Sequence, residues 1–451
     1  MNKKIIYPAM ILLFGVAVVF IFVNFKKKQS QAASYELKER NGALAKSSEY
    51  IRTRASADRL KLAIEENPDD KKSQLALAAL YIQEARITGD HMYYDGAAMQ
   101  QVNNVLNNDP NNFEALTYKT LIYLSQHHFA DALEVAQKAK DINPYNAFIY
   151  GLMADANVEM GNYTKAVENC DEMVSIRPDI RSYSRISYLR EIYGDYPGAI
   201  DAMNRAVEAG MPGDEGTAWA RVQLGHLYEN TGDLKRAEMQ YTIALDERPE
   251  YAYALAGMAH IATANKDHAK AIRYYLKADS LVADNVFKEE LVDVYKLAGE
   301  NEKAEKLAQS VIEDMNKASK AALTDENIGH YSDRELAYAY LKVNEYDKAL
   351  THALAEYNRR PDNNDVNETV AWVYYNQNKA DKAIPYIKEA LKTNCKNPSL
   401  LVHAGLIYAK AGEKKLAKKY LEQSTASNAY ISPSLQSELV SAMHDLSIAS
   451  K

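Results

Sequence analysis

Residues 222–249 read VQLGHLYENTGDLKRAEMQYTIALDERP, which has the pattern of two short amphipathic helices separated by a turn. The turn contains Gly232, and glycine adopts the left-handed conformation after a helix at the least steric cost. Pro249 ends the second helix, because proline lacks the N–H that a continuing helix needs. The stretch therefore predicts a helical hairpin.

The same pattern recurs along most of the chain. A small residue stands at one fixed place in each second helix, and the spacings between successive copies are 34, 33, 38, 34, 33, 45, 34 and 34 residues. The small residues are Ala132, Ala166, Ala199, Ala237, Ala271, Ala304, Ala349, Ala383 and Ala417. A proline follows twelve residues later in four copies, at Pro144, Pro178, Pro249 and Pro361. The hairpin is thus one copy of a repeat.

This period and this pattern resemble the tetratricopeptide repeat (TPR), a helix-turn-helix unit of about 34 residues. The matching positions in the quoted stretch are Leu224, Gly225, Tyr228, Ala237, Tyr241, Ala244 and Pro249. The resemblance implies an all-α, right-handed α-solenoid of roughly eleven hairpins, in which small residues allow close helix packing. No unit buries its apolar face alone, so stability comes from stacking on neighbours.

The chain divides into consecutive segments. After residue 88 we expect an insert around TGDHMYYDG, with the second helix of that unit resuming at Ala97 or Ala98. The 45-residue spacing after Ala304 is best read as a tolerated insertion at a repeat junction, with a hinge or a longer helix as the alternatives. A new helix capped by Thr324 or Ser332 is expected to follow. The predicted segments are a membrane anchor (1–28), a juxtamembrane linker (29–47), degenerate N-terminal units (48–110), the main array (113–312), an insert (313–329), C-terminal units (330–430), and a capping helix and tail (431–451).

Composition limits the class of protein. Only 18 glycines and 12 prolines in 451 residues favour long helices over a many-turned β fold. The net charge of -7 argues against a nucleic-acid partner, since such proteins usually carry a basic face. Cys170 and Cys395 lack the spacing of a disulfide framework or a zinc ribbon.

Residues 5–25, IIYPAMILLFGVAVVFIFVNF, contain no ionisable acid or base and are long enough to cross the ~30 Å hydrocarbon core of a bilayer. A cleaved signal peptide is the alternative, because Ala32, Ala33 and Ser34 follow. Lys26, Lys27 and Lys28 stand where the cleavage region would be, which favours an uncleaved single-pass anchor in the cell membrane.

The side of the membrane has two readings. The lysines after the span favour a cytoplasmic body, whereas the layout of a short basic tail and a long following domain favours an extracytoplasmic one. We predict that the repeats lie outside the cytoplasm, in the periplasm of a bacterial envelope.

Within the resemblance, first helices line a concave groove. The groove positions hold aromatic and imidazole side chains that the repeat pattern does not require, and these are candidates for gripping a peptide or helix of a partner. The alternative is that these rings simply pack between helices in a chain with 33 tyrosines. The candidates are Phe148, Tyr188, Trp219, His226, Tyr253, His260, Tyr331, Tyr338 and Trp372.

Motifs of enzymes and metal sites are not found in the sequence. His226 and His260 occupy the same place in adjacent units, but helix axes 8–10 Å apart appear too distant for shared zinc ligands, so we predict neither metal nor cofactor. His127 and His128 are expected to face solvent in a turn.

The resulting hypothesis is a membrane-tethered, non-catalytic TPR scaffold that binds a partner protein or peptide, of unknown identity, in its concave groove. The alternatives are a structural accessory or assembly subunit of a membrane or envelope complex, and an enzyme with an unrecognised site.

Overall fold

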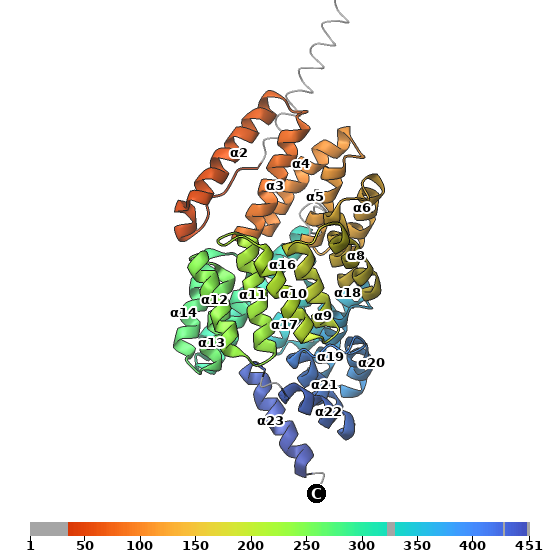
Figure 1. Cartoon of the computed structure of the whole chain (residues 1–451). Helices are drawn as coiled ribbons and strands as arrows, with labels where there is room; N and C mark the ends of the chain where they lie inside the picture. Colours follow the sequence, from red (N-terminus) through yellow and green to blue (C-terminus); the bar gives the residue numbers. More distant parts are fainter. Residues whose placement is uncertain (1–34, 323–329, 427–428, 449–451) are drawn as a thin grey trace, which may run out of the picture.

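The computed structural model describes residues 35–322, 330–426 and 429–448, and these residues form a helical solenoid (Figure 1). A short 3₁₀ helix, η1 (Gly42–Lys46), and a single helix, α2 (Ser48–Glu66), come first. Ten hairpins follow, and α23 (Pro433–Ile448) comes last. The hairpins are α3 (Lys71–Thr88) with α4 (His91–Asn108), α5 (Phe113–Ser125) with α6 (Phe129–Ile142), α7 (Ala147–Glu159) with α8 (Tyr163–Ile176), α9 (Ile180–Ile192) with α10 (Tyr196–Ala209), α11 (Glu215–Asn230) with α12 (Leu234–Glu247), α13 (Ala252–Ala264) with α14 (His268–Leu281), α15 (Asn285–Leu297) with α16 (Asn301–Ala322), α17 (Asp333–Lys342) with α18 (Tyr346–Arg359), α19 (Asn364–Asn376) with α20 (Ala380–Ala390), and α21 (Pro398–Lys410) with α22 (Lys414–Thr425).

Small residues let the two helices of each hairpin approach closely, as the pattern predicts. All nine repeat alanines are at most 1% exposed. A Cβ added to Gly225 would lie 2.3 Å from the Tyr241 ring, and one added to Gly257 would lie 2.6 Å from the same ring. Tyr241 is therefore clamped between α11 and α13, and the spacing of these helices depends on both glycines.

Glycines also end several first helices. Gly161, Gly194 and Gly232 have φ values of 76°, 72° and 78°, in the region where only glycine avoids strain. In the hairpin of α3 and α4 this turn lies earlier than expected. Gly89 has φ 73°, the Asp90 side chain accepts a hydrogen bond from the Tyr93 backbone N–H, and α4 begins at His91.

Two further expectations are corrected by the packing. The segment HMYYDG is the first turn and a half of α4, with Tyr94 fully buried, so there is no insert before Ala97. The linker expected at 29–47 is packed from Tyr35 onward: the Tyr81 hydroxyl donates to the Tyr35 carbonyl, and Arg40, 3% exposed, pairs with Glu84. These contacts involve polar side chains, which the hydrophobic pattern does not register.

The break after Ala304 is a longer helix as far as the structure describes it. Helix α16 continues to Ala322, and Val311, Ile312 and Met315 pack against α17 and α18. Ser332 occupies the position before α17, where its side chain makes no capping hydrogen bond. Thr324 lies outside the described residues.

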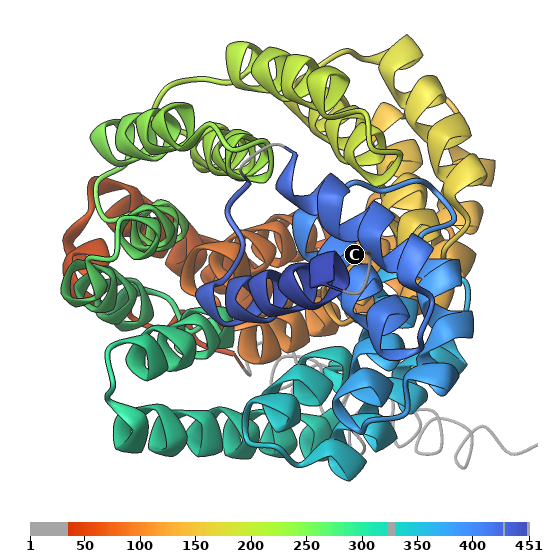
Figure 2. The same cartoon turned by 90° about the horizontal axis from the view of Figure 1, so that it is seen from below.

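Each turn of the solenoid contacts the next one. Residues 199 to 205 apart in sequence are in direct contact, including Glu49 with Arg248, His127 with Tyr331, and Glu159 with Arg360. That offset corresponds to roughly six 34-residue units. In the view along the axis the helices form a ring, and α23 lies over its middle (Figure 2).

No helix among the described residues is long and apolar enough to cross a membrane. The predicted span at residues 5–25 lies outside the described residues.

Candidate binding cavity and histidine cluster

The inner face of the ring encloses a cavity of about 1490 Å³. Its lining comes mainly from the first helices α3, α5, α7, α9 and α11, and α17 and α19 of the next turn add Arg334 and Asp365. A second cavity of about 350 Å³ adjoins it, because Arg86, Trp219 and His226 line both. The wall of the turn thus surrounds a half-open cavity.

Six of the nine candidate groove residues line these two cavities. Phe148, Tyr188, Trp219 and His226 line the larger one, and Tyr253 and His260 line the smaller one. Tyr188 is 43% exposed, so its ring is available for contact. The Arg181 guanidinium lies over the Phe148 ring, 4.6 Å from its centroid.

The other three candidates face different surroundings. Tyr331 stacks on His128 at the contact between turns, with centroids 4.3 Å apart. The Arg334 guanidinium lies over the Tyr338 ring, 5.5 Å from its centroid. Trp372 stacks between Tyr375 and His403 beside α23.

The turn histidines are engaged between turns of the solenoid, so the expectation that they face solvent is wrong. His127 Nδ1 lies 2.9 Å from the Tyr331 carbonyl, and its ring centroid is 4.2 Å from that of His330. The side chain of His128 is 10% exposed. These contacts exist only because the ring closes six units later.

Charged groups of both signs line the larger cavity. Seven arginines and nine carboxylates give it a slight acidic excess of two. Several of them pair across the lining: Arg185 Nε donates to Asp155 Oδ1 at 2.8 Å, and Arg86 lies 2.7 Å from Glu215. A cavity of this balance does not favour a polyanionic ligand such as nucleic acid.

One acid in this lining is held partly in its neutral form. Burial raises the pKa of Glu191 to about 7, although Asn230 Nδ2 donates to its Oε1 at 3.1 Å. Burial likewise raises the pKa of Glu159, despite its pairing with Arg360. The inner wall therefore contains carboxyl groups that burial makes easier to protonate than exposed ones.

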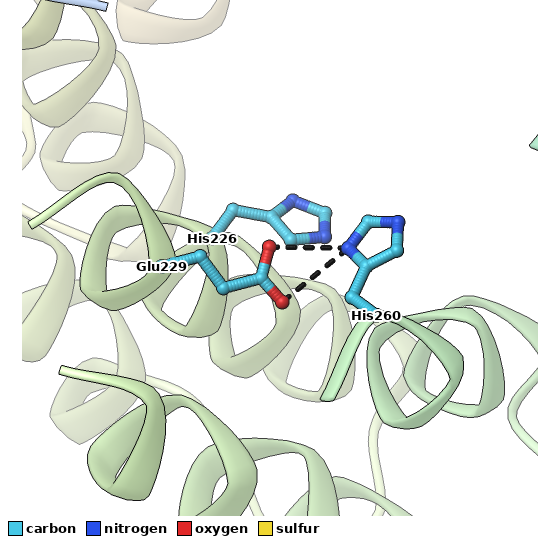
Figure 3. A group of neighbouring side chains, drawn as sticks. All are labelled: His226, Glu229 and His260. Carbon is cyan, nitrogen blue, oxygen red and sulfur yellow. Dashed lines mark hydrogen bonds and ion pairs between the residues drawn. The ribbon is translucent and has the colours of Figure 1, made fainter. Parts of the chain in front are cut away.

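The histidines at equivalent places of α11 and α13 meet in the smaller cavity (Figure 3). His260 Nδ1 lies 3.1 Å from Glu229 Oε2, and His260 Nε2 lies 3.2 Å from Glu290 Oε1. The His226 and His260 ring centroids are 5.9 Å apart. The spacing of the helix axes therefore does not separate these side chains as expected, because both imidazoles point into the same space.

Electrostatics differ between the two histidines. Burial lowers the pKa of His226, which favours the neutral ring. Burial acts in the same direction on His260, but the flanking Glu229 and Glu290 outweigh it and raise its pKa well above the usual value. The Tyr241 hydroxyl donates to Glu229 Oε1 at 2.8 Å and fixes that carboxylate from the other side.

The segment before α23 reaches this cluster. The Tyr430 backbone N–H donates to the Glu229 carbonyl at 3.1 Å, and the Tyr430 ring stacks on His260 with centroids 5.7 Å apart. From there α23 packs on α21 and α22 through Leu435 and Leu439. The helix predicted as an end cap therefore also covers the inner side of the ring.

Sequence reasoning missed the polar residues of the inner wall, such as Glu191, Arg185, Arg334 and Glu290. Their positions on first helices are visible in the repeat register. Their partners come from the neighbouring unit or the next turn, and the sequence of a single unit does not predict such partners.

Comparisons with known proteins agree with the repeat architecture. The family description "Tetratricopeptide repeat" matches residues 222–285, 334–398 and 398–430. No curated protein matches the sequence.

Solved structures match at low identity. A tetratricopeptide repeat protein from Parabacteroides merdae is 17% identical, with 60% of this chain and 98% of that one covered and a TM-score of 0.42. TTC0263, a TPR protein of Thermus thermophilus, is 19% identical over 44% of this chain and 99% of that one, with a TM-score of 0.38. The human IFIT1 dimer with PPP-AAAA is 14% identical over 76% and 80%, with a TM-score of 0.46.

Proposed function

Because the chain contains tetratricopeptide repeats and forms a scaffold of the kind used for protein–protein interaction, we propose that it is a membrane-tethered, non-catalytic scaffold that holds a segment of a partner protein in its inner cavity. The observation that carries the proposal is the cavity of about 1490 Å³ lined by Phe148, Tyr188 and Trp219.

Aromatic side chains that are partly exposed inside a half-open cavity are suited to binding. They bury a large area on contact while losing little rotamer freedom, and they are enriched among residues that dominate binding energy. The mixed charges around them supply hydrogen bonds to a peptide backbone and to polar side chains. The best fit is an extended peptide or a loop, since helices line the wall of this half-open cavity.

The proposed membrane tether is inferred from the sequence of residues 5–25. Residues 5–25 have the length and hydropathy of a membrane span, and the described chain begins at Tyr35, already packed on α3 and α4. The nine residues between them, 26–34, reach at most about 30 Å. An anchor at 5–25 would therefore keep the α2 end of the solenoid near the bilayer and raise the local concentration of a membrane-bound partner.

Site-specific photocrosslinking in cells tests the cavity. A photoreactive amino acid replaces Trp219 in one strain and Tyr145, which is 84% exposed on a loop, in a matched control. We expect a discrete partner crosslinked from position 219 and not from 145. Crosslinks from position 145 alone would contradict the cavity proposal, and a partner that co-purifies unchanged with Trp219→Ala would favour an accessory subunit that uses an outer face.

Labelling of intact cells tests the side of the membrane. Tyr145→Cys provides an exposed thiol once Cys170 and Cys395 are replaced by alanine. A membrane-impermeant maleimide should label this cysteine without lysis if the body is extracytoplasmic. Labelling that requires lysis would place it in the cytoplasm.

A further inference from the structure

We propose that His226, Glu229 and His260 form a binding site for one divalent transition-metal ion of the zinc class, with a fourth coordination position open to the inner cavity. One ligand atom from each of these residues lies within 4.8 Å of the others. Figure 3 shows the two imidazoles and the carboxylate facing a common space.

The backbone brings the three side chains together. His226 and Glu229 are three residues apart on α11 and so share one face of the helix, while His260 comes from the facing side of α13. The two helices are close because the Tyr241 ring fits against Gly225 and Gly257, which lack a Cβ. Glu229 is 6% exposed, so its carboxylate is removed from bulk water.

The distances suit a single ion. Zinc bonds to imidazole nitrogen and carboxylate oxygen are roughly 2.0–2.2 Å long, which in a tetrahedron places neighbouring ligand atoms about 3.4 Å apart. His260 Nδ1 and Glu229 Oε2 are already 3.1 Å apart. Small side-chain rotations of His226 complete the set, and two histidines with one glutamate are the ligands of open zinc sites.

The surrounding residues hold the ligands in the required state. Glu290 Oε1 lies 3.2 Å from His260 Nε2, so it accepts the proton of that nitrogen, and a bound cation would displace the proton from Nδ1 and coordinate there. The Tyr241 hydroxyl binds Glu229 Oε1 and leaves Oε2 facing the histidines. Carboxylates that orient a ligating imidazole in this way are a regular feature of protein metal sites.

An ion pair alone explains only part of the arrangement. A protonated His260 between Glu229 and Glu290 accounts for those three side chains. It does not account for the second imidazole, that of His226. This ring also lies beside the Glu229 carboxylate, although no ion pair is formed between the two. A bound cation gives all three groups one role.

The open position faces the cavity of about 350 Å³, which Trp219, Gln223 and Tyr253 also line. Water would fill this position on an ion bound to the isolated protein. A carboxylate or imidazole from a bound segment can replace that water, so the site would add one directional contact to a cavity otherwise lined by aromatic and paired charged groups.

The test uses the full chain in mild detergent, stripped of metal by a chelator and dialysed. Isothermal titration with Zn²⁺ and the visible absorption of Co²⁺ measure stoichiometry and geometry. We expect one ion per chain, a tetrahedral Co²⁺ spectrum, and at least a hundredfold loss of affinity in both His226→Ala and His260→Ala. Glu290→Gln should weaken binding by about 10- to 100-fold, because it supports the ligand without touching the ion.

His403→Ala is the matched control, since His403 also faces a carboxylate, Glu368, at 2.8 Å but has no second histidine beside that pair among the described residues. Its affinity for the ion should stay within about threefold of wild type. If the wild-type chain does not bind the ion stoichiometrically, the three side chains form an ion pair and no metal site, and the proposal is overturned. This outcome does not depend on whether the variants fold. Binding that survives loss of both His226 and His260 would also overturn the proposal, whereas failure of the partner crosslink at Trp219 would leave the metal site unaffected.

Discussion

The contacts within hairpins and the contacts between turns of the solenoid are built from different residues. Inside a hairpin, alanines and glycines let large rings such as Tyr241 pack between helices, and nearly all the contacts are apolar. Between turns, many contacts are polar: Arg360 pairs with Glu159, Asn363 Nδ2 donates to the Glu159 carbonyl at 3.0 Å, and the Tyr163 hydroxyl accepts from the Asn364 N–H at 2.8 Å. The repeat sets the curvature of the wall, and a separate set of polar residues fastens one turn to the next.

This difference implies that the solenoid can lose its structure in two ways. Loss of a hairpin contact should unfold a unit and its neighbours, because each unit is stabilised by stacking. Loss of a contact between turns should lower stability and let the turns separate before the helices unfold. The following variants separate these outcomes.

The largest effect is expected from Arg360→Ala. Arg360 is 5% exposed, pairs with Glu159 and Glu356, and lies over the Phe129 ring. Its removal leaves the Glu159 carboxylate without its cation and leaves Glu356 with Arg359 alone, which costs about 3–5 kcal/mol. Urea denaturation followed by circular dichroism measures the loss, and hydrogen exchange should increase most near residues 157–163.

Arg236→Ala is the control for that variant. Arg236 pairs with Asp233 within one exposed turn, and its side chain is 59% exposed. Its loss should change stability by less than about 1 kcal/mol. Equal losses in the two variants would contradict a special role for the contact between turns.

Gly225→Ala should have the next largest effect. The added methyl would lie 2.3 Å from Tyr241 Cε1, so α11 must move away from α12, at a cost of about 1–3 kcal/mol. Gly216→Ala on the same helix is the matched variant, because its Cβ meets nothing nearer than Ile180 at 3.8 Å. That second substitution should leave urea stability unchanged or slightly raised, and a loss equal to that of Gly225→Ala would argue against tight packing at Tyr241.

Glu191→Gln should produce the smallest and most pH-dependent effect. Burial raises the pKa of Glu191 from 4.5 to about 7, so the folded chain binds more protons here than the unfolded chain between these values. Its contribution to stability is therefore present below pH 4.5 and lost as pH rises to 7. The amide should stabilise the chain by about 1–2 kcal/mol at pH 8 and by little at pH 4.5. Thermal melts at the two pH values check this, and a difference of opposite sign would refute the assigned cause.

Much of the fold follows from the sequence because hairpin packing is periodic. The alanine spacing places every second helix from α6 to α22, and the turn glycines locate several first-helix ends. Prediction failed at α4, where HMYYDG is helical because Asp90 caps it, and at Tyr35–Arg40, which hydrogen bonds hold in place. Caps and polar contacts of this kind lack periodicity.

The site was predictable only in part. The repeat register placed six aromatic and imidazole residues on the cavity wall, but it gave no information on side-chain direction. Helix spacing alone therefore predicts that His226 and His260 are too far apart to share a ligand, although both rings point into one space. Tyr331 and His128 meet through ring closure, which requires knowing that about six units complete a turn.

The central claim, that the solenoid closes into a ring around a cavity, is tested most directly by crosslinking between turns. His127 and His330 have ring centroids 4.2 Å apart, so His127→Cys with His330→Cys, in a chain lacking Cys170 and Cys395, should be joined rapidly by a short bifunctional thiol reagent. Tyr145→Cys with His330→Cys is the control, because the 14-residue helix α6 separates position 145 from position 127 by about 21 Å. Efficient crosslinking of the first pair and not of the second is the predicted result. Failure of the first pair, in a chain whose helical content is unchanged, would contradict the closed ring.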